Sequence, residues 1–306
     1  MPDSIRVALV MPVHNRREIT LQLLRSLSRI DRSGLDVRVI VVDDGSTDGT
    51  GEAIRRDFPA VQVEAGDGTL HYTAGTNRGL AAALRLDPLF IVAMNDDSIV
   101  HRDFLQHLVG CALEYPDGVI GALLLRGDLP HLAFQVAPVW STWRGGWQTP
   151  QELAFWALPR RPFPVESIVG NCVLYPAAAV RAVGLMDERR FPHSHADAVY
   201  LSAMRRAGWR LLVEPRALVW CQPNVYPPPL HTLPLGEVLR ILLLDARHPH
   251  NLKRELGARW ASAPSRPQAV TAFGIYCGRL ALKALGIGRA RRERTSAPAA
   301  LSRSPR

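Results

Sequence analysis

The stretch "VRVIVVDDGSTDGT" (residues 37–50) predicts a strand, a tight turn and the start of a helix. The apolar, β-branched run ends at Asp43 and Asp44, and Gly45 and hydroxyl residues follow. A phosphate-binding loop at this place would be neutral or basic, so the pair of acids argues against a Walker-type loop. It favours carboxylates that bind the N–H and O–H donors of a base or ribose. The alternative is an Asx turn in which Ser46 or Thr47 caps the helix.

Apolar runs of the same kind recur along the first hundred residues, with helical patterns between them. This alternation predicts a mostly parallel sheet covered by helices on both faces, an α/β fold. Ligands of such sheets bind beyond the carboxyl ends of the strands. Polar clusters that follow three separate strands are therefore expected at one edge. The predicted strands are 6–13, 37–44, 61–65 and 89–95.

A second pair of acids follows the strand in "IVAMNDDSIV" (residues 91–100), where Asn95, Asp96 and Asp97 stand at its end. Adjacent carboxylates repel each other, and a hard divalent cation relieves that repulsion. Mg²⁺ and Mn²⁺ are commonly held by one or two carboxylates plus substrate phosphates. The alternative is a surface loop in which Asp97 or Ser98 caps the next helix.

The second half of the chain is less regular. Residues 118–163 are rich in Trp, Pro and Gly, "RLLVEPRALVW" (210–220) predicts a pair of strands, and "QPNVYPPPL" predicts a linker. The predicted organisation has three parts: an α/β domain, an amphipathic helical extension and a basic tail without regular structure. Their expected boundaries are 1–222, 223–288 and 289–306, with extension helices around 235–246, 247–260 and 268–287.

Charge and cysteine content limit the partners. The formal net charge is +9, and residues 247–306 hold 13 Lys+Arg against 2 Asp+Glu. This basic end lacks a nucleic-acid motif, so anionic phospholipid or a phosphate-bearing acceptor is the expected partner and nucleic acid is not. The end helices either lie on a membrane surface or pack on the α/β domain. Four scattered cysteines without a CxxC predict reduced thiols in a cytoplasmic protein, peripheral on the inner membrane face if the helices bind lipid.

Five motifs in a fixed order resemble those of family 2 glycosyltransferases with the GT-A fold, closest to a rhamnosyltransferase-like branch. They are "VALVMPVHNR", "VIVVDDGSTDGT", "GDGTLHYTAGTNRGLAAAL", "FIVAMNDDSIV" and "FPHSHADAVYLSAMRRAGW", and the resemblance covers residues 5 to 222. It implies a GT-A, Rossmann-like α/β sheet flanked by helices with a C-terminal helical extension. It also implies an inverting transfer of a sugar from a nucleoside-diphosphate donor to a glycan or lipid-linked acceptor in cell-envelope synthesis.

The resemblance assigns roles to individual residues. Asp97 is the implied ligand of a divalent cation, Mg²⁺ or Mn²⁺, and Asp96 contacts the metal, the ribose or the donor sugar. The implied donor-binding residues are Pro12, His14, Asn15, Asp43, Asp44, Asn77, Arg78 and Asp96.

The family's general base is an acid that precedes a helix, and Asp197 in "HADAVY" occupies that place. An acceptor hydroxyl is a weak nucleophile unless its proton leaves as the new bond forms, and a carboxylate is ionised at neutral pH. The alternative role of Asp197 is to cap the helix.

The chain departs from the family pattern at two places. Val199 stands where many relatives have a second acid, and Cys221 and Gln222 stand where many have a histidine metal ligand. Either the metal site has fewer protein ligands or His193 or His195 substitutes, since His231 is some distance downstream. The departures leave a second function open, a catalytically silent nucleotide-sugar-binding partner of another transferase. A nucleotidyltransferase is disfavoured because no basic, Gly-rich loop follows the first strand.

Overall fold

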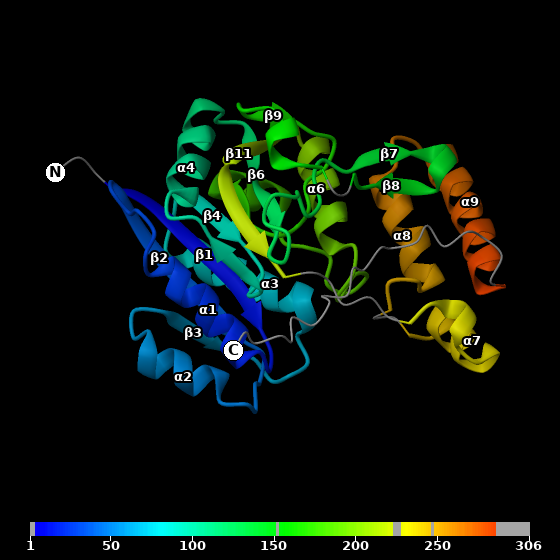
Figure 1. Cartoon of the computed structure of the whole chain (residues 1–306), viewed down its shortest axis with the longest axis horizontal. Helices are drawn as coiled ribbons and strands as arrows, with labels where there is room; N and C mark the ends of the chain where they lie inside the picture. The colour runs from blue at the N-terminus through cyan, green and yellow to red at the C-terminus, as the bar shows by residue number, and fades with distance from the viewer. Residues whose placement is uncertain (1–3, 151–152, 223–227, 246–247, 286–306) are drawn as a thin grey trace, which may run out of the picture.

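The computed structural model describes residues 4–150, 153–222, 228–245 and 248–285. Its centre is a large sheet with strand order β3-β2-β1-β4-β10-β6-β11-β5, and β9 pairs with β11 (Figure 1). The predicted strands of the first half are all present, and they run parallel. The strands are β1 (Ile5–Val13), β2 (Leu35–Asp43), β3 (Gln62–Ala65), β4 (Phe90–Ala93), β5 (Ser98–Val100), β6 (Gly118–Arg126), β9 (Phe163–Pro164), β10 (Val173–Pro176) and β11 (Arg210–Cys221).

The second half of the sheet is mixed. β10 runs antiparallel to both neighbours, β4 and β6, whereas β6 and β11 are parallel. β5 and β9 are antiparallel to β11. The mostly parallel sheet of the GT-A fold is confirmed.

Both faces of the sheet are buried, as its apolar strands require. Along β1, Val7, Leu9 and Met11 belong to one core, and Ala8 and Val10 belong to the other. Successive side chains of a strand point to opposite faces, so one strand supplies both cores. The first core is closed by α1 (Arg17–Leu27), α2 (Thr50–Asp57) and α4 (Phe104–Glu114), and the second by α3 (His71–Arg85), α5 (Ala177–Val183) and α6 (Ala196–Arg206).

The predicted strand pair at residues 210–220 is wrong, because β11 is one strand with a register shift between Glu214 and Leu218. Pro215 has no N–H for the ladder, so the irregularity falls where the sequence interrupts the strand. The fully buried Glu214 carboxylate accepts the backbone N–H of Arg216 at 2.9 Å and the Arg216 Nε at 2.8 Å.

Three further helices follow the sheet, α7 (Leu235–Leu243), α8 (Leu252–Ser262) and α9 (Arg266–Ala284), close to the predicted positions. Figure 1 shows them on one side of the molecule, with α9 beside the small hairpin of β7 (Val139–Ser141) and β8 (Gly146–Gln148). The short helical turns are η1 (Thr142–Arg144), η2 (Phe155–Ala157) and η3 (Leu230–Thr232). In the part of the chain that the structure describes, no helix has the length and apolar character to cross a membrane. Most of the predicted linker (223–227) and the predicted tail (289–306) lie outside the described residues.

Candidate active site

The loops that follow β1, β2 and β4 line one cavity of about 670 Å³. Asp44, Asp96 and Asp97 reach it from the parallel strands, and Asp197 reaches it from the first turn of α6. Four carboxylates from three distant parts of the sequence therefore share one space. Pro12 and His14 also line the cavity.

Arg16 holds the acidic pair that follows β4. Its Nη1 lies 3.0 Å from Asp96 Oδ1, and its Nη2 lies 3.4 Å from Asp97 Oδ2. Asp96 is buried and also accepts the Thr20 hydroxyl at 3.2 Å, whereas Asp97 keeps part of its surface exposed. One guanidinium thus offsets the repulsion between the two carboxylates.

Burial raises the pKa of Asp96 to about 6, and the neighbouring Asp97 adds to this rise against the opposing effect of Arg16 and Thr20. A carboxyl whose pKa is higher in the folded than in the unfolded state binds its proton more tightly when folded. Its contribution to the free energy of unfolding is therefore greatest below about pH 4 and falls as the pH rises to about 6.

We expect Asp96→Asn to remove this dependence. The difference in unfolding free energy between variant and wild type should grow by roughly 2–3 kcal/mol between pH 4 and pH 7, because each unit of pKa difference corresponds to about 1.4 kcal/mol. Denaturant titrations of both proteins across this pH range measure it. A difference that stays constant with pH would contradict the raised pKa.

The acids that follow β2 are engaged with the backbone. Asp44 Oδ1 accepts the N–H of Gly68 at 2.8 Å, and its Oδ2 accepts the N–H of His71 at 3.1 Å. Asp43 Oδ1 accepts the N–H of Ser46 at 3.1 Å, as in the turn that the sequence offered as an alternative, and Asp43 is not among the cavity-lining residues. Asp44 therefore both shapes the loop before α3 and faces the cavity.

The β1 loop is tied to the β2 loop. His14 Nδ1 lies 2.6 Å from the carbonyl oxygen of Asp44, and Asn15 Oδ1 accepts the N–H of Thr47 at 2.7 Å. Asn15 has a φ of 51° and also donates its backbone N–H to the Ser46 hydroxyl at 2.9 Å. His14 lines the cavity and Asn15 does not, so the structure places Asn15 where it joins two loops.

Asn77 and Arg78 lie away from the cavity. The buried Asn77 side chain donates to the carbonyl of Met186 at 2.9 Å and to Glu188 at 2.7 Å, and it accepts the N–H of Met186 at 2.9 Å. Arg78 is exposed on α3, and neither residue lines the cavity. Asn77 therefore joins α3 to the segment that precedes α6.

Asp197 is fixed by a close neighbour. Its Oδ2 accepts the backbone N–H of Gly170 at 3.0 Å, and a Cβ on Gly170 would overlap the Asp197 side chain. The hydroxyl of Tyr72 donates to the carbonyl of Gly170 at 3.3 Å, and Tyr72 also lines the cavity. His195, with φ of 69°, precedes the helix, so Asp197 stands inside its first turn and not at the capping position.

A hydrogen-bonded group of side chains lies at the side of the cavity next to β11. Asn171 Nδ2 donates to Ser98 Oγ at 3.0 Å and lies 3.2 Å from Cys221 Sγ, while its Oδ1 accepts the N–H of Asn95 at 2.9 Å. Asn95 Oδ1 is buried without a hydrogen-bond partner and lines the cavity together with Gln222. An amide oxygen in that state suits a ligand hydroxyl, because leaving it unpaired costs about 1–3 kcal/mol.

The residues fit a divalent cation only in part. Asp96 and Asp97 offer carboxylates, but among the described residues no three His, Cys, Asp or Glu side chains gather into a group that could hold a metal ion. Burial raises the pKa of the Cys221 thiol to about 12, so it stays protonated. His231 lies on η3 outside the cavity, whereas His193 and His195 line it. Two carboxylates suffice if donor phosphates supply further oxygen ligands.

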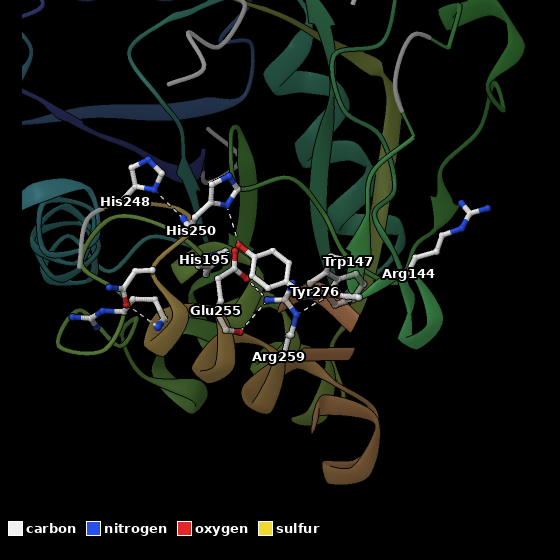
Figure 2. Close-up of polar contacts among 12 residues, drawn as sticks. Arg144, Trp147, His195, His248, His250, Glu255, Arg259 and Tyr276 are labelled. Carbon is white, nitrogen blue, oxygen red and sulfur yellow. Dashed lines mark hydrogen bonds and ion pairs between the residues drawn. The ribbon is translucent and has the colours of Figure 1, made fainter. Parts of the chain in front are cut away.

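A buried network joins this site to the C-terminal helices (Figure 2). Glu255 of α8 lies with Oε1 3.7 Å from His195 Nε2, and its other oxygen pairs with Arg259. The Arg259 Nε donates to the carbonyl of Gly145 at 2.8 Å, and its guanidinium lies 4.1 Å from the centre of the Tyr276 ring. The loop that carries His195 and the β7–β8 hairpin are thus held by the same helix.

Sequence reasoning missed three residues of the site: Arg16, Gly170 and Asn171. Arg16 directly follows "PVHN", and Gly170 and Asn171 stand in "VGNC" (169–172). The signal for Arg16 was its position: it is a cation directly after a motif that is expected at the same edge of the sheet as the paired acids. Nothing in the sequence indicates that Gly170 packs against a residue 27 positions later.

Comparisons with known proteins find similarity to glycosyltransferases. Residues 8–154 match the family model "Glycosyl transferase family 2". The chain is 27% identical over 208 residues to an N-acetylglucosaminyl-diphospho-decaprenol L-rhamnosyltransferase of Mycobacterium tuberculosis, found in the strains CDC 1551 and H37Rv. That alignment covers 60% of this chain and 66% of the relative, slightly less than two thirds of its length.

Solved glycosyltransferases share the fold at low identity. GalNAc-T7 with UDP, GalNAc and Mn²⁺ superposes with a TM-score of 0.60 at 11% identity, over 94% of this chain and 57% of the other. The mannosyltransferase PcManGT of Pyrobaculum calidifontis, in complex with GDP-Man and Mn²⁺, gives 0.55 at 17% identity, over 92% and 73%. Residues 8–154 therefore resemble a family 2 glycosyltransferase domain, and the chain has the GT-A fold.

Proposed function

We propose that this protein transfers a sugar from a nucleoside-diphosphate donor to a hydroxyl of a lipid-linked glycan acceptor in cell-envelope synthesis. The observation that carries the proposal is the cavity in which Asp44, Asp96 and Asp97 meet Asp197. The similarity to a transferase whose name specifies a diphospho-decaprenol acceptor supports the lipid-linked class. The family match supports the nucleotide-sugar donor.

In this proposal the donor lies along the loops of β1, β2 and β4. Asp44, His14 and Pro12 face the nucleoside, and Asp96 and Asp97 face the diphosphate and the ribose. The structural neighbours hold Mn²⁺, and a divalent cation at Asp96 and Asp97 would offset the negative charge that grows on the departing diphosphate. Asp43, Asn15 and Asn77 act through the loops they hold, and Arg78 has no place at the cavity.

Asp197 takes the acceptor proton. The acceptor oxygen forms a bond to the anomeric carbon as its proton passes to the carboxylate, and the bond between that carbon and the diphosphate breaks. A single displacement of this kind inverts the configuration at the anomeric carbon. Gly170 and Tyr72 keep the carboxylate in place before the step.

The proposed place of action is the cytoplasmic face of a membrane. A lipid-linked acceptor confines the reaction to a bilayer surface. The four cysteines, Cys111, Cys172, Cys221 and Cys277, are free thiols, which agrees with a reducing compartment.

A panel of nucleoside-diphosphate sugars tests the donor assignment. The matching donor should raise the Tm by several degrees when Mn²⁺ is present, since binding to the folded state alone stabilises it. Asp97→Asn should abolish the part of the shift that depends on Mn²⁺. Asp103→Asn, on the loop before α4 and outside the cavity, is the matched control and should leave it unchanged.

The same preparation separates transfer from silent binding. Transfer of the sugar to a polyprenyl-diphosphate glycan, followed by mass spectrometry, is the expected result. Donor binding with no turnover towards any lipid-linked acceptor would favour the silent partner. The absence of both binding and turnover across the panel would contradict the assignment of the cavity.

A further inference from the structure

Helix α7 carries more apolar surface than the fold uses. Val238 and Ile241 are buried and pack in one small core with Leu230 and Leu280. Leu235, Leu239 and Leu243, spaced four residues apart, instead line another face of the helix. They are 74%, 49% and 61% exposed, and Leu244 directly after the helix is 77% exposed. We call these four residues the leucine face.

Two leucines near the end of α9 are also exposed, on sides of the helix turned away from the core that it shares with α7. Leu280 is buried in the same core as Val238, and Ala284 packs against that core. The neighbouring Leu282 and Leu285 are 48% and 70% exposed. Figure 1 shows the last turns of α9 above α7, at the edge of the molecule farthest from β1 and β2. Isolated exposed leucines are ordinary on protein surfaces, but a row of them along one helix marks an interaction surface.

Charge near the leucine face becomes positive towards the C-terminus, since Glu237 and Asp245 offset Arg240 on and just after α7. Lys283 is exposed on the last turn of α9, and Arg240 of α7 forms an exposed pair with Glu237 at 3.8 Å. The sequence beyond residue 285 adds six arginines and one glutamate. An apolar helix face with basic residues nearby is the composition of helices that lie in the lipid interface.

We propose that the leucine face docks the protein on an anionic lipid bilayer. This inference rests on the proposed function, because it is the lipid-linked acceptor that requires the active site to work at a membrane. Charge decides between a bilayer and a second copy of the chain. A two-fold contact would pair two chains that each carry a formal net charge of +9, whereas an anionic surface complements that charge.

A chain of contacts connects the leucine face of α7 to the active-site cavity. The core of Leu230, Val238, Ile241 and Leu280 joins α7 to α9, and Arg279 of α9 donates to the carbonyl of Arg144 at 2.7 Å. Arg259 of α8 holds the adjoining Gly145, and its partner Glu255 lies beside His195 at the cavity. A lipid contact at α7 is thereby connected through packed helices to the side of the site where Asp197 stands.

Flotation with vesicles of phosphatidylglycerol and phosphatidylcholine tests the proposal. Wild type should float with anionic vesicles and much less with pure phosphatidylcholine. The double variant Leu239→Glu/Leu243→Glu should lower the partition by at least about tenfold, since binding scales with buried apolar area and charge. Leu113→Glu, at a leucine of α4 that is 50% exposed, is the matched control and should float as wild type does.

Each result bears on a separate claim. Equal flotation of wild type and the double variant, or no flotation of wild type, overturns the leucine face as a lipid surface. A double variant that turns a dimer into a monomer by light scattering, with unchanged flotation, shows a contact between copies and also overturns it. Donor-induced stabilisation in the absence of lipid should be unchanged in the double variant. If the donor does not stabilise wild type either, that result contradicts the proposed function and leaves the lipid surface unaffected.

Discussion

Asp197→Asn is expected to lower kcat for sugar transfer by about 10²–10⁴-fold, the usual contribution of a positioned general base. The amide oxygen of Asn can still accept the Gly170 N–H, which lies 3.0 Å from Asp197 Oδ2 in the structure. The variant therefore keeps its local packing and loses only the ability to take a proton. Donor affinity, measured by titration with the nucleoside diphosphate, should change little because the donor-side carboxylates remain.

Asp187→Asn provides the control for this experiment. Asp187 Oδ1 likewise accepts a backbone N–H, from Arg190 at 2.9 Å, but Asp187 does not line the cavity. Its variant should retain wild-type kcat. If transfer by Asp197→Asn came within a factor of a few of wild type, Asp197 would be a structural residue of α6 and another group would be the base.

Gly170→Ala has the second large expected effect. A methyl group at this position would overlap the side chain of Asp197, so the carboxylate must move or the loop before β10 must shift. Displacements of about 1 Å at a catalytic group can cost about 10²-fold in rate. We expect kcat to fall by about that factor, with a smaller change in the affinity for the donor.

Gly110→Ala is the matched control, because a Cβ at this exposed position of α4 meets no atom within 4 Å. Alanine in a helix interior is favoured over glycine by about 0.5–1 kcal/mol, so this variant should be fully active and slightly more stable. Circular dichroism and thermal unfolding of both variants separate a local displacement from a loss of fold. A fully active Gly170→Ala would show that the Asp197 position tolerates such movement.

The first half of the fold could be predicted because its signals are local. Each parallel strand is a short apolar run, and the loops after β1, β2 and β4 are polar. The rule that ligands bind at the carboxyl ends of parallel strands therefore brought Asp44, Asp96 and Asp97 together correctly. The antiparallel insertion of β10 between β4 and β6 has no such local signal, because it depends on how a strand from the second half of the chain returns to the sheet.

The residues that differ most from expectation are those whose partners are distant in sequence. Asn77 hydrogen-bonds to Met186, and Asp44 closes on the amides of Gly68 and His71. A motif shows which residues recur together, but it does not distinguish a side chain that contacts a ligand from one that holds a loop. Whether Asp44 also contacts a base is a proposal that the donor titrations address.

The predicted boundary at residue 222 has a consequence for protein design. Glu255 is buried beside His195, Arg254 donates to the carbonyl of Arg189 at 3.0 Å, and Gly257 lies against the ring of Phe191. A shortened protein that ends after β11 would strip the cover from the loop leading into α6 and would expose an aromatic side chain to water. Homologous chains with unrelated C-terminal segments are therefore poor donors for chimeras at this junction, unless the segment supplies a replacement for α8.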